Sequence, residues 1–336
     1  MALLDVDNLR TYFSTRAGVV HAVDGVSFSV DRARTLGLVG ESGCGKTVTA
    51  LSIIGLLPSS RARVVSGSIR FDGREFVGLP ERSLREIRGR AIGMVFQDPL
   101  TSLNPAFTIG AQLVETLRRH LPLAKKEAQR RATELLDEVR IPGAERRLGE
   151  YPHHFSGGMR QRVMIALAIA CNPQLLIADE PTTALDVTIQ AQILDLLDEL
   201  KREHEMAMII ITHDMGVVAE TADEVAVMYA GQIVEHAPAH ELFAQPEHPY
   251  TQALLTALPR LEDEAIRTSR LPTIPGQPPE LIEPPASCRF APRCPYAGLD
   301  DGCATRAQEL RELRPRHWVR TAHPACERAR VATATA

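Results

Sequence analysis

Short apolar runs alternate with helical stretches along much of this 336-residue chain. The runs TLGLVG (35–40), AIGMVF (91–96), LLIAD (175–179) and MAMIIIT (206–212) each have the length and apolar content of a buried strand. The stretch TIQAQILDLLDELKRE (188–203) has an apolar face of helical spacing, made by Ile189, Ile193, Leu196, Leu197 and Leu200. Buried strands that alternate with helices predict an α/β fold with a mainly parallel sheet covered on both faces.

Three other parts of the chain follow different patterns. Residues 3–13, 21–30 and 67–72 alternate roughly between apolar and polar positions and predict short strands. Residues 100–165 have helical periodicity and no convincing strand, which predicts a helical insertion. Residues 261–285 are rich in proline and favour an extended linker, after which a cysteine-rich stretch begins.

Composition narrows the class of protein. The hydrophobic fraction is 44%, the charged fraction is 24% and the net charge is −4, so no global basic field argues for nucleic acid. No apolar stretch reaches the roughly 18–20 residues that span a bilayer. The N-terminal MALLDVDNLR lacks the basic and then apolar pattern of a signal peptide. We therefore expect a cytoplasmic protein whose cysteines stay reduced.

The segment GESGCGKT (40–47) matches the phosphate-loop pattern G-x-x-x-x-G-K-[ST] between a predicted strand and a helical run. Its glycines let backbone N–H groups face phosphate oxygens, and the following helix N-terminus favours an anion. Lys46 is expected to reach the β- and γ-phosphates, and Thr47 to place its hydroxyl on Mg²⁺. Cys44 is expected to contribute its N–H rather than its thiol. The predicted nucleotide-binding residues here are Gly40, Glu41, Ser42, Gly43, Cys44, Gly45, Lys46 and Thr47.

A second candidate element is LLIADEP (175–181), in which a predicted strand ends in two acids. We expect Asp179 beside the phosphate loop, in the shell of the Mg²⁺ ion. Glu180 is then positioned to polarise an attacking water. The plain alternative is a strand that simply ends in Asp-Glu-Pro, and the phosphate loop earlier in the chain argues against it.

The segment FSGGMRQR (155–162) resembles the signature of ATP-binding cassette (ABC) ATPases. The family's other elements also appear along the chain in the family's order. Gln97 resembles the glutamine of the Q-loop, residues 184–186 (ALD) resemble the D-loop, and His213 resembles the switch histidine. Phe13 holds the position of the aromatic residue that stacks on adenine, with Tyr12 as the alternative. The resemblance covers residues 3–260 and implies an α/β P-loop ATPase fold with an antiparallel β subdomain and a helical subdomain.

The resemblance also implies roles for these residues. A helix is implied to begin at Ser156, Gly157 and Gly158, and its N-terminus to form an anion site that faces the ATP of a second subunit. Asp186 is also implied to be a nucleotide-binding residue. The implied catalytic residues are Glu180, His213 and Gln97, and the implied Mg²⁺ ligands are Thr47, Gln97 and Asp179. Met159 departs from the common signature, which has Gln there, but the backbone anion site does not require that side chain.

The segments QDPLTSLNP (97–105) and EHPYTQALLTALP (247–259) resemble those of oligopeptide/dipeptide importer ATPases. This implies a peripheral subunit at the cytoplasmic face of the inner membrane that hydrolyses ATP to power peptide import. The implied partners are a second, homologous ATPase subunit, two transmembrane permease subunits and an extracytoplasmic substrate-binding protein, and no nucleic acid. Import of nickel or another small solute stays open. A soluble ABC ATPase of ribosomes or DNA is disfavoured by the single cassette and by the short separation of Thr47 from Ser156.

Four of the six cysteines lie near the C-terminus: Cys288, Cys294, Cys303 and Cys326. Their spacing lacks the C-x2-C knuckles of common zinc sites and leaves buried thiols, zinc and an iron–sulfur cluster open, with His317 or His323 as substitute ligands. CRFAPRCPYA (288–297) resembles peptide-importer ATPases in which four cysteines bind a [4Fe-4S] cluster, so the resemblance favours that cluster over zinc. The predicted domains are a nucleotide-binding domain at 1–260 with its helical subdomain at about 100–165, a linker at 261–285, and a small Cys-rich metal- or cluster-binding domain at 286–328.

Overall fold

The structure, a computed structural model, describes residues 2–58, 61–183, 185–257, 273–297 and 302–325. The chain divides into two compact units. The first unit comprises Met1–Leu4, Val30–Thr35 and Phe71–Ile211. The second unit comprises Asp5–Ser29, Leu36–Arg70 and Thr212–Ala336.

Parallel strands form the centre of the first unit. Strand β6 (Ile92–Val95) pairs in parallel with β7 (Leu175–Asp179), and β7 pairs in parallel with β8 (Ala207–Thr212). Every residue of β7 and β8 is buried, which explains why these strands read as unbroken apolar runs rather than as alternating patterns. The three strands predicted in this part of the chain are confirmed.

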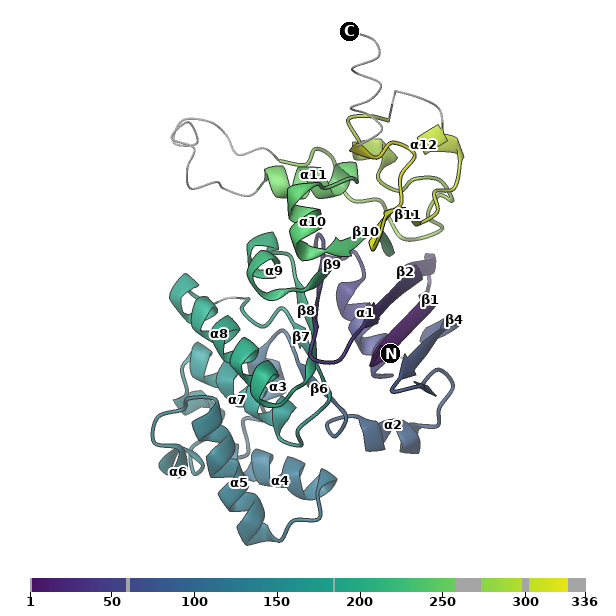
Figure 1. Ribbon diagram of the computed structural model, residues 1–336. Helices are drawn as coiled ribbons and strands as arrows, with labels where there is room; N and C mark the ends of the chain where they lie inside the picture. The colour runs from purple at the N-terminus through teal and green to yellow at the C-terminus, as the bar shows by residue number, and fades with distance from the viewer. Residues whose placement is uncertain (1, 59–60, 184, 258–272, 298–301, 326–336) are drawn as a thin grey trace, which may run out of the picture. The chain divides into compact units, whose positions relative to one another are not determined.

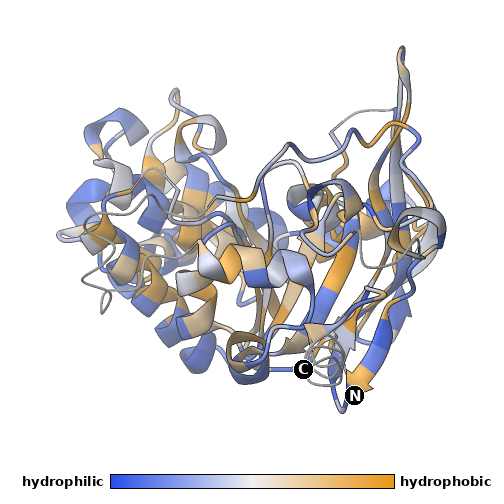
Figure 2. Ribbon diagram, turned by 90° about the horizontal axis from the view of Figure 1, so that it is seen from above, coloured by the Kyte–Doolittle hydropathy of each residue, from blue (hydrophilic) through white to orange (hydrophobic). Residues whose placement is uncertain are grey.

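Helices make up most of the rest of the first unit (Figure 1). The helices predicted over residues 100–165 are observed. They are α3 (Pro99–Ser102), α4 (Ile109–His120), α5 (Lys125–Glu138), α6 (Ala144–Arg147), a 3-10 turn at Pro152–His154 and α7 (Gly157–Ile169). The unit also contains β5 (Arg74–Glu75), α2 (Glu81–Ile87) and α8 (Val187–Glu203). The amphipathic helices α4, α5 and α8 turn their apolar faces into a single core, and Figure 2 shows hydrophobic and hydrophilic residues alternating along the helices.

The second unit holds the remaining predicted strands. Strands β2 (Gly18–Val30), β1 (Leu4–Thr15) and β4 (Ala62–Phe71) lie side by side in that order. Because only two residues join β1 to β2, these two strands form an antiparallel hairpin. The predicted strands at 3–13, 21–30 and 67–72 are thereby confirmed, each longer than its pattern suggested.

In the second unit, strand β3 (Thr35–Val39) pairs in parallel with β9 (Glu224–Tyr229). Strand β9 pairs antiparallel with β10 (Gln232–Pro238). The helices of this unit are α1 (Lys46–Ile53), α9 (Met215–Thr221), α10 (Ala239–Ala244), α11 (Pro249–Thr256) and α12 (Gly302–Thr305), with a 3-10 turn at Ala291–Arg293.

The C-terminal segment adds strands to this same sheet. Strand β12 (His317–Val319) pairs antiparallel with β10 and with β11 (Arg311–Arg314). His317 is fully buried, and its Nε2 lies 2.8 Å from the buried Glu235 carboxylate on β10. That carboxylate also accepts hydrogen bonds from the backbone N–H groups of Glu247 and His248. His317 therefore has a structural partner in the sheet.

Candidate active site

The phosphate loop follows strand β3 and leads into α1. Gly40 and Gly45 have φ angles of 151° and 108°, in a region that glycine adopts more readily than other residues. A Cβ atom at Gly40 would lie 2.1 Å from the Met228 carbonyl oxygen, and one at Gly45 would lie 2.2 Å from that of Ala22. These glycines therefore allow both the turn and the close approach of neighbouring backbone.

Lys46 is the first residue of α1, and it is almost fully buried. Its Nζ donates hydrogen bonds to the carbonyl oxygens of Gly40 at 2.7 Å and Glu41 at 3.0 Å. The Lys46 ammonium group is thus bound to the start of the loop in which it is predicted to bind a phosphate. Burial raises the pKa of the neighbouring Cys44 thiol, which is therefore held protonated and is a poor nucleophile. The Cys44 N–H donates to the Glu41 carbonyl at 3.3 Å, within the loop.

In the first unit, the side chains of Gln97 and Glu180 lie together. Gln97 follows β6 and Glu180 follows β7, and these strands are parallel neighbours. Gln97 Nε2 donates to Glu180 Oε2 at 2.8 Å, and Thr183 Oγ1 donates to the same oxygen at 2.9 Å. Glu180 has a φ of 47°, an uncommon conformation for a residue with a side chain.

Asp179 ends β7 and is 2% exposed. Hydroxyl, carboxylate and amide oxygens are the ligands that Mg²⁺ prefers, so the side chains of Thr47, Asp179 and Gln97 fit that ion chemically. Thr47 belongs to the second unit, and the other two residues belong to the first. Thr183 is a functional candidate that the sequence did not single out, although it lies only three residues after Glu180.

The signature segment forms the start of α7. Ser156 is the N-cap residue, and its Oγ accepts a hydrogen bond from the Met159 N–H at 3.4 Å. A Cβ at Gly158 would lie 2.7 Å from Ile189 Cγ2, so this glycine lets α7 approach α8 closely. Met159 itself packs against the core of the first unit. The unusual side chain at this position therefore contributes apolar contact and leaves the helix N-terminus in place.

Two further predicted residues lie at helix starts. Asp186 is the N-cap of α8 and accepts a hydrogen bond from the Ile189 N–H at 3.0 Å. His213 directly follows β8 and precedes Asp214, which caps α9 by accepting hydrogen bonds from the N–H groups of Gly216 and Val217. The predicted D-loop residue Ala184 lies outside the described residues.

The two candidates for adenine stacking are neighbours in β1. Tyr12 stacks on His21 with ring centroids 4.0 Å apart, and its hydroxyl donates to Asp24 at 2.9 Å. Burial and this hydrogen bond raise the pKa of Tyr12 to about 12. Phe13 is half-buried. Because Tyr12 already has a ring partner, Phe13 stays the better candidate for a base.

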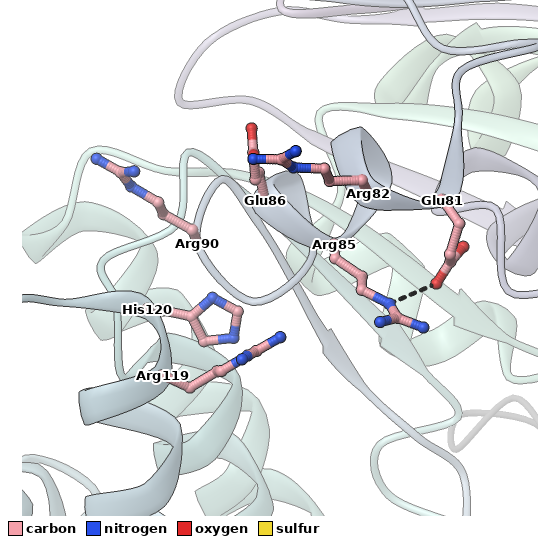
Figure 3. A pocket seen from close by; sticks show the side chains of 7 residues that line it. All are labelled: Glu81, Arg82, Arg85, Glu86, Arg90, Arg119 and His120. Atoms are coloured by element: carbon pink, nitrogen blue, oxygen red, sulfur yellow. Dashed lines mark hydrogen bonds and ion pairs between the residues drawn. The ribbon is translucent and has the colours of Figure 1, made fainter.

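A pocket of about 570 Å³ lies in the first unit between α2 and the end of α4 (Figure 3). Its lining consists of Glu81, Arg82, Arg85, Glu86, Arg90, Arg119 and His120. Burial lowers the pKa of His120, and the nearby charges of Arg119 and Arg90 lower it further, so this imidazole is held neutral. The surplus of guanidinium groups suits an acidic group, and none of the predicted site residues lines this pocket.

Three of the four tail cysteines lie in the described part of the second unit. The Cys288 N–H donates to the Cys303 carbonyl at 3.1 Å, and Cys303 is buried. Burial raises the pKa of the Cys288 thiol. Among the described residues, no three or more Cys, His, Asp or Glu side chains are grouped to hold a metal ion, so the described residues alone do not make the predicted metal site. Cys326 lies outside the described residues.

In the described parts of the chain, no helix is long and apolar enough to cross a membrane. Family models match two regions of the chain: that of ABC transporters at residues 23–183, and that of the oligopeptide/dipeptide transporter C-terminal region at residues 234–303.

Relatives named for peptide transport match almost the whole chain. A probable peptide ABC transporter ATP-binding protein of Sinorhizobium fredii is 54% identical, covering 94% of this chain and 93% of its own. The oligopeptide transport ATP-binding protein OppD of Salmonella typhimurium is 52% identical, covering 88% and 87%. A dimeric ATP-binding cassette, MJ0796 bound to ADP and Pi, aligns with a TM-score of 0.63 at 26% identity, covering 70% of this chain and 98% of that one. The chain therefore belongs to the ABC transporter ATPases, and within them to the family of oligopeptide and dipeptide transport ATP-binding proteins.

Proposed function

We propose that this chain is the ATP-hydrolysing subunit that powers peptide import across the cytoplasmic membrane. The observation that carries the proposal is the hydrogen bond from Gln97 to Glu180 in a chain whose relatives are named for peptide transport. The match to the oligopeptide/dipeptide C-terminal region supports this branch of the family over other ABC importers. Import of nickel or another small solute is the alternative.

The proposed chemistry divides among the residues of the site. Lys46 binds the β- and γ-phosphates, and Glu180 polarises the attacking water and accepts its proton. Thr47, Asp179 and Gln97 would hold Mg²⁺, which neutralises phosphate charge when it is bound. His213 contacts the γ-phosphate, and Phe13 stacks on adenine. The helix start at Ser156, Gly157 and Gly158 contacts the nucleotide held by a second subunit, and Asp186 belongs to the nucleotide-binding residues.

We propose that the chain works as a peripheral subunit on the cytoplasmic face of the membrane. Its partners are a second homologous ATPase subunit, two permease subunits and an extracytoplasmic binding protein. Closing of two ATPase subunits on ATP, and their reopening after hydrolysis, would drive alternating access in the permease. The family membership and the relatives' names support this arrangement.

Uptake measurements test the substrate class. A strain that lacks the gene is expected to lose uptake of labelled di- and oligopeptides, and the intact chain is expected to restore it. Restoration of nickel uptake alone would favour the alternative substrate. Co-purification after detergent extraction provides the second test, because recovery of ribosomes or DNA in place of permease subunits would contradict the importer assignment.

We also propose that Cys288, Cys294, Cys303 and Cys326 together bind a [4Fe-4S] cluster, with zinc as the alternative. The backbone hydrogen bond between Cys288 and Cys303 supports a shared site. Four thiolates suit either metal.

Anaerobic purification tests the tail directly. The intact protein is expected to be brown with broad absorbance near about 400 nm. Cys294→Ser is expected to lose the colour, whereas the matched control Cys171→Ser, which changes a buried cysteine in the core of the first unit, is expected to keep it. Colourless protein with one zinc per chain would indicate zinc, and protein without metal would indicate plain buried thiols.

A further inference from the structure

An ion pair joins the phosphate loop to the C-terminal segment. Arg293, next to Cys294 in the tail, donates from one terminal nitrogen to Glu41 Oε2 at 2.7 Å and from the other to Glu41 Oε1 at 3.0 Å. Two parallel bonds between a guanidinium and a carboxylate fix the geometry as well as the charge. Both residues belong to the second unit, although 252 positions separate them in the sequence.

The surroundings hold Arg293 in place. Its side chain is only 4% exposed, and its Nε donates to the Pro275 carbonyl at 2.9 Å. The guanidinium lies over the Tyr229 ring, 5.8 Å from the centroid. Hydrogen bonding to Glu41 raises the pKa of Arg293 above its ordinary value, so the group stays charged. A buried arginine with these contacts is a rigid partner rather than a mobile surface cation.

Glu41 is held at three points. Its side chain pairs with Arg293, its N–H donates to the Tyr250 hydroxyl at 2.9 Å, and its carbonyl accepts from Lys46 Nζ. The Tyr250 ring packs in turn against Tyr229 and Phe290, with centroids 4.6 Å and 5.4 Å apart. The tail and the helix α11 therefore hold the residue at which the glycine-rich loop begins to turn.

Two physical reasons make this contact relevant to nucleotide binding. A carboxylate inside a phosphate-binding loop repels the triphosphate unless its charge is balanced, and Arg293 balances it at contact distance. A loop rich in glycine also loses much conformational freedom when it closes on a ligand, and fixing it beforehand lowers that cost.

We propose that Arg293 is a positioning residue for the phosphate loop, which acts through Glu41 to neutralise its charge and to hold the loop in its binding conformation. The C-terminal segment thereby contributes to nucleotide affinity. The inference rests on the proposed assignment of residues 40–47 as the nucleotide-binding loop.

The test measures binding of ATPγS with Mg²⁺ to the purified full-length chain by titration calorimetry, together with thermal unfolding. Arg293→Met leaves Glu41 unpaired and is expected to weaken binding about tenfold. In the Glu41→Gln background no carboxylate remains to repel the phosphates, so adding Arg293→Met is expected to change the affinity less than twofold. A merely structural role would lower the unfolding temperature of Arg293→Met and leave its ATPγS affinity unchanged.

Arg320→Met is the matched control. Arg320 also comes from the tail, and its guanidinium donates to the carbonyls of Ile233 and Gln308, away from the phosphate loop. This variant is expected to lower the unfolding temperature and to leave ATPγS affinity unchanged. If Arg293→Met behaves as Arg320→Met does, the inference is wrong.

Two further variants separate the possible failures. If Lys46→Ala does not weaken ATPγS binding either, the assignment of the phosphate loop is wrong; if only Arg293→Met has no effect, the positioning role alone is wrong. Should Arg293→Met not fold, Arg293→Lys replaces it. This variant keeps the charge but loses the two-pronged contact, so a loss of about threefold is expected and unchanged affinity would refute the role.

Discussion

Glu180→Gln is expected to lower the ATP hydrolysis rate by about 10²–10⁴-fold while ATP binding is retained. The amide keeps the shape of the carboxylate and can still accept hydrogen bonds from Gln97 and Thr183, which both donate to Glu180 Oε2. It cannot accept a proton from water at neutral pH, so only the chemical step is lost. Single-turnover hydrolysis and ATP binding measured on the same preparation separate these two effects.

A matched control comes from the same region of the chain. Glu199→Gln removes a carboxylate that pairs with Arg140 on the surface of the first unit and is expected to leave the hydrolysis rate unchanged. Full ATPase activity in Glu180→Gln would contradict the assignment of Glu180 as the residue that activates water. Accumulation of an ATP-bound dimer in that variant would agree with the assignment.

Lys46→Ala is expected to weaken ATP binding by about ten- to a hundredfold and to abolish transport. The change removes a buried ammonium group that donates to the Gly40 and Glu41 carbonyls. The loop then loses both the group that binds the phosphates and the hydrogen bonds that hold its own carbonyl oxygens. Fluorescent-nucleotide titration measures the affinity, and peptide uptake in cells measures the consequence.

Lys201→Ala is the control for this variant. Lys201 donates to Thr35 Oγ1 and lies close to Asp198, so its loss affects the stability of the first unit rather than nucleotide contacts. We expect unchanged nucleotide affinity in this control. Tight ATP binding by Lys46→Ala would count against the phosphate-loop assignment.

Local sequence patterns predicted most of the regular structure because each pattern reflects burial within one element. The unbroken apolar run of β7 corresponds to a strand whose every residue is buried, and the amphipathic run at 188–203 corresponds to α8. The proximity of Gln97 and Glu180 was also predictable, since both follow parallel strands. The other candidate site residues were predicted from the order of the family's motifs along the chain.

Contacts between distant segments carry no such local signal. The pair of Glu41 with Arg293 and the pair of Glu235 with His317 depend on how the tail packs against the rest of the second unit. The pairing of β12 with β10 was missed for the same reason, because a three-residue strand is too short to show a period. The apolar packing of Met159 likewise depends on the core around α7.

The Arg293–Glu41 pair has a consequence for the tail itself, because coupling between two sites is reciprocal. If Arg293 adds a certain free energy to nucleotide binding, a bound nucleotide stabilises the folded state of the segment that carries Arg293 by the same amount. The stability of the C-terminal segment would therefore rise with the nucleotide concentration around it. If Arg293 positions the phosphate loop as proposed, the folding of the tail would depend on whether a nucleotide occupies that loop.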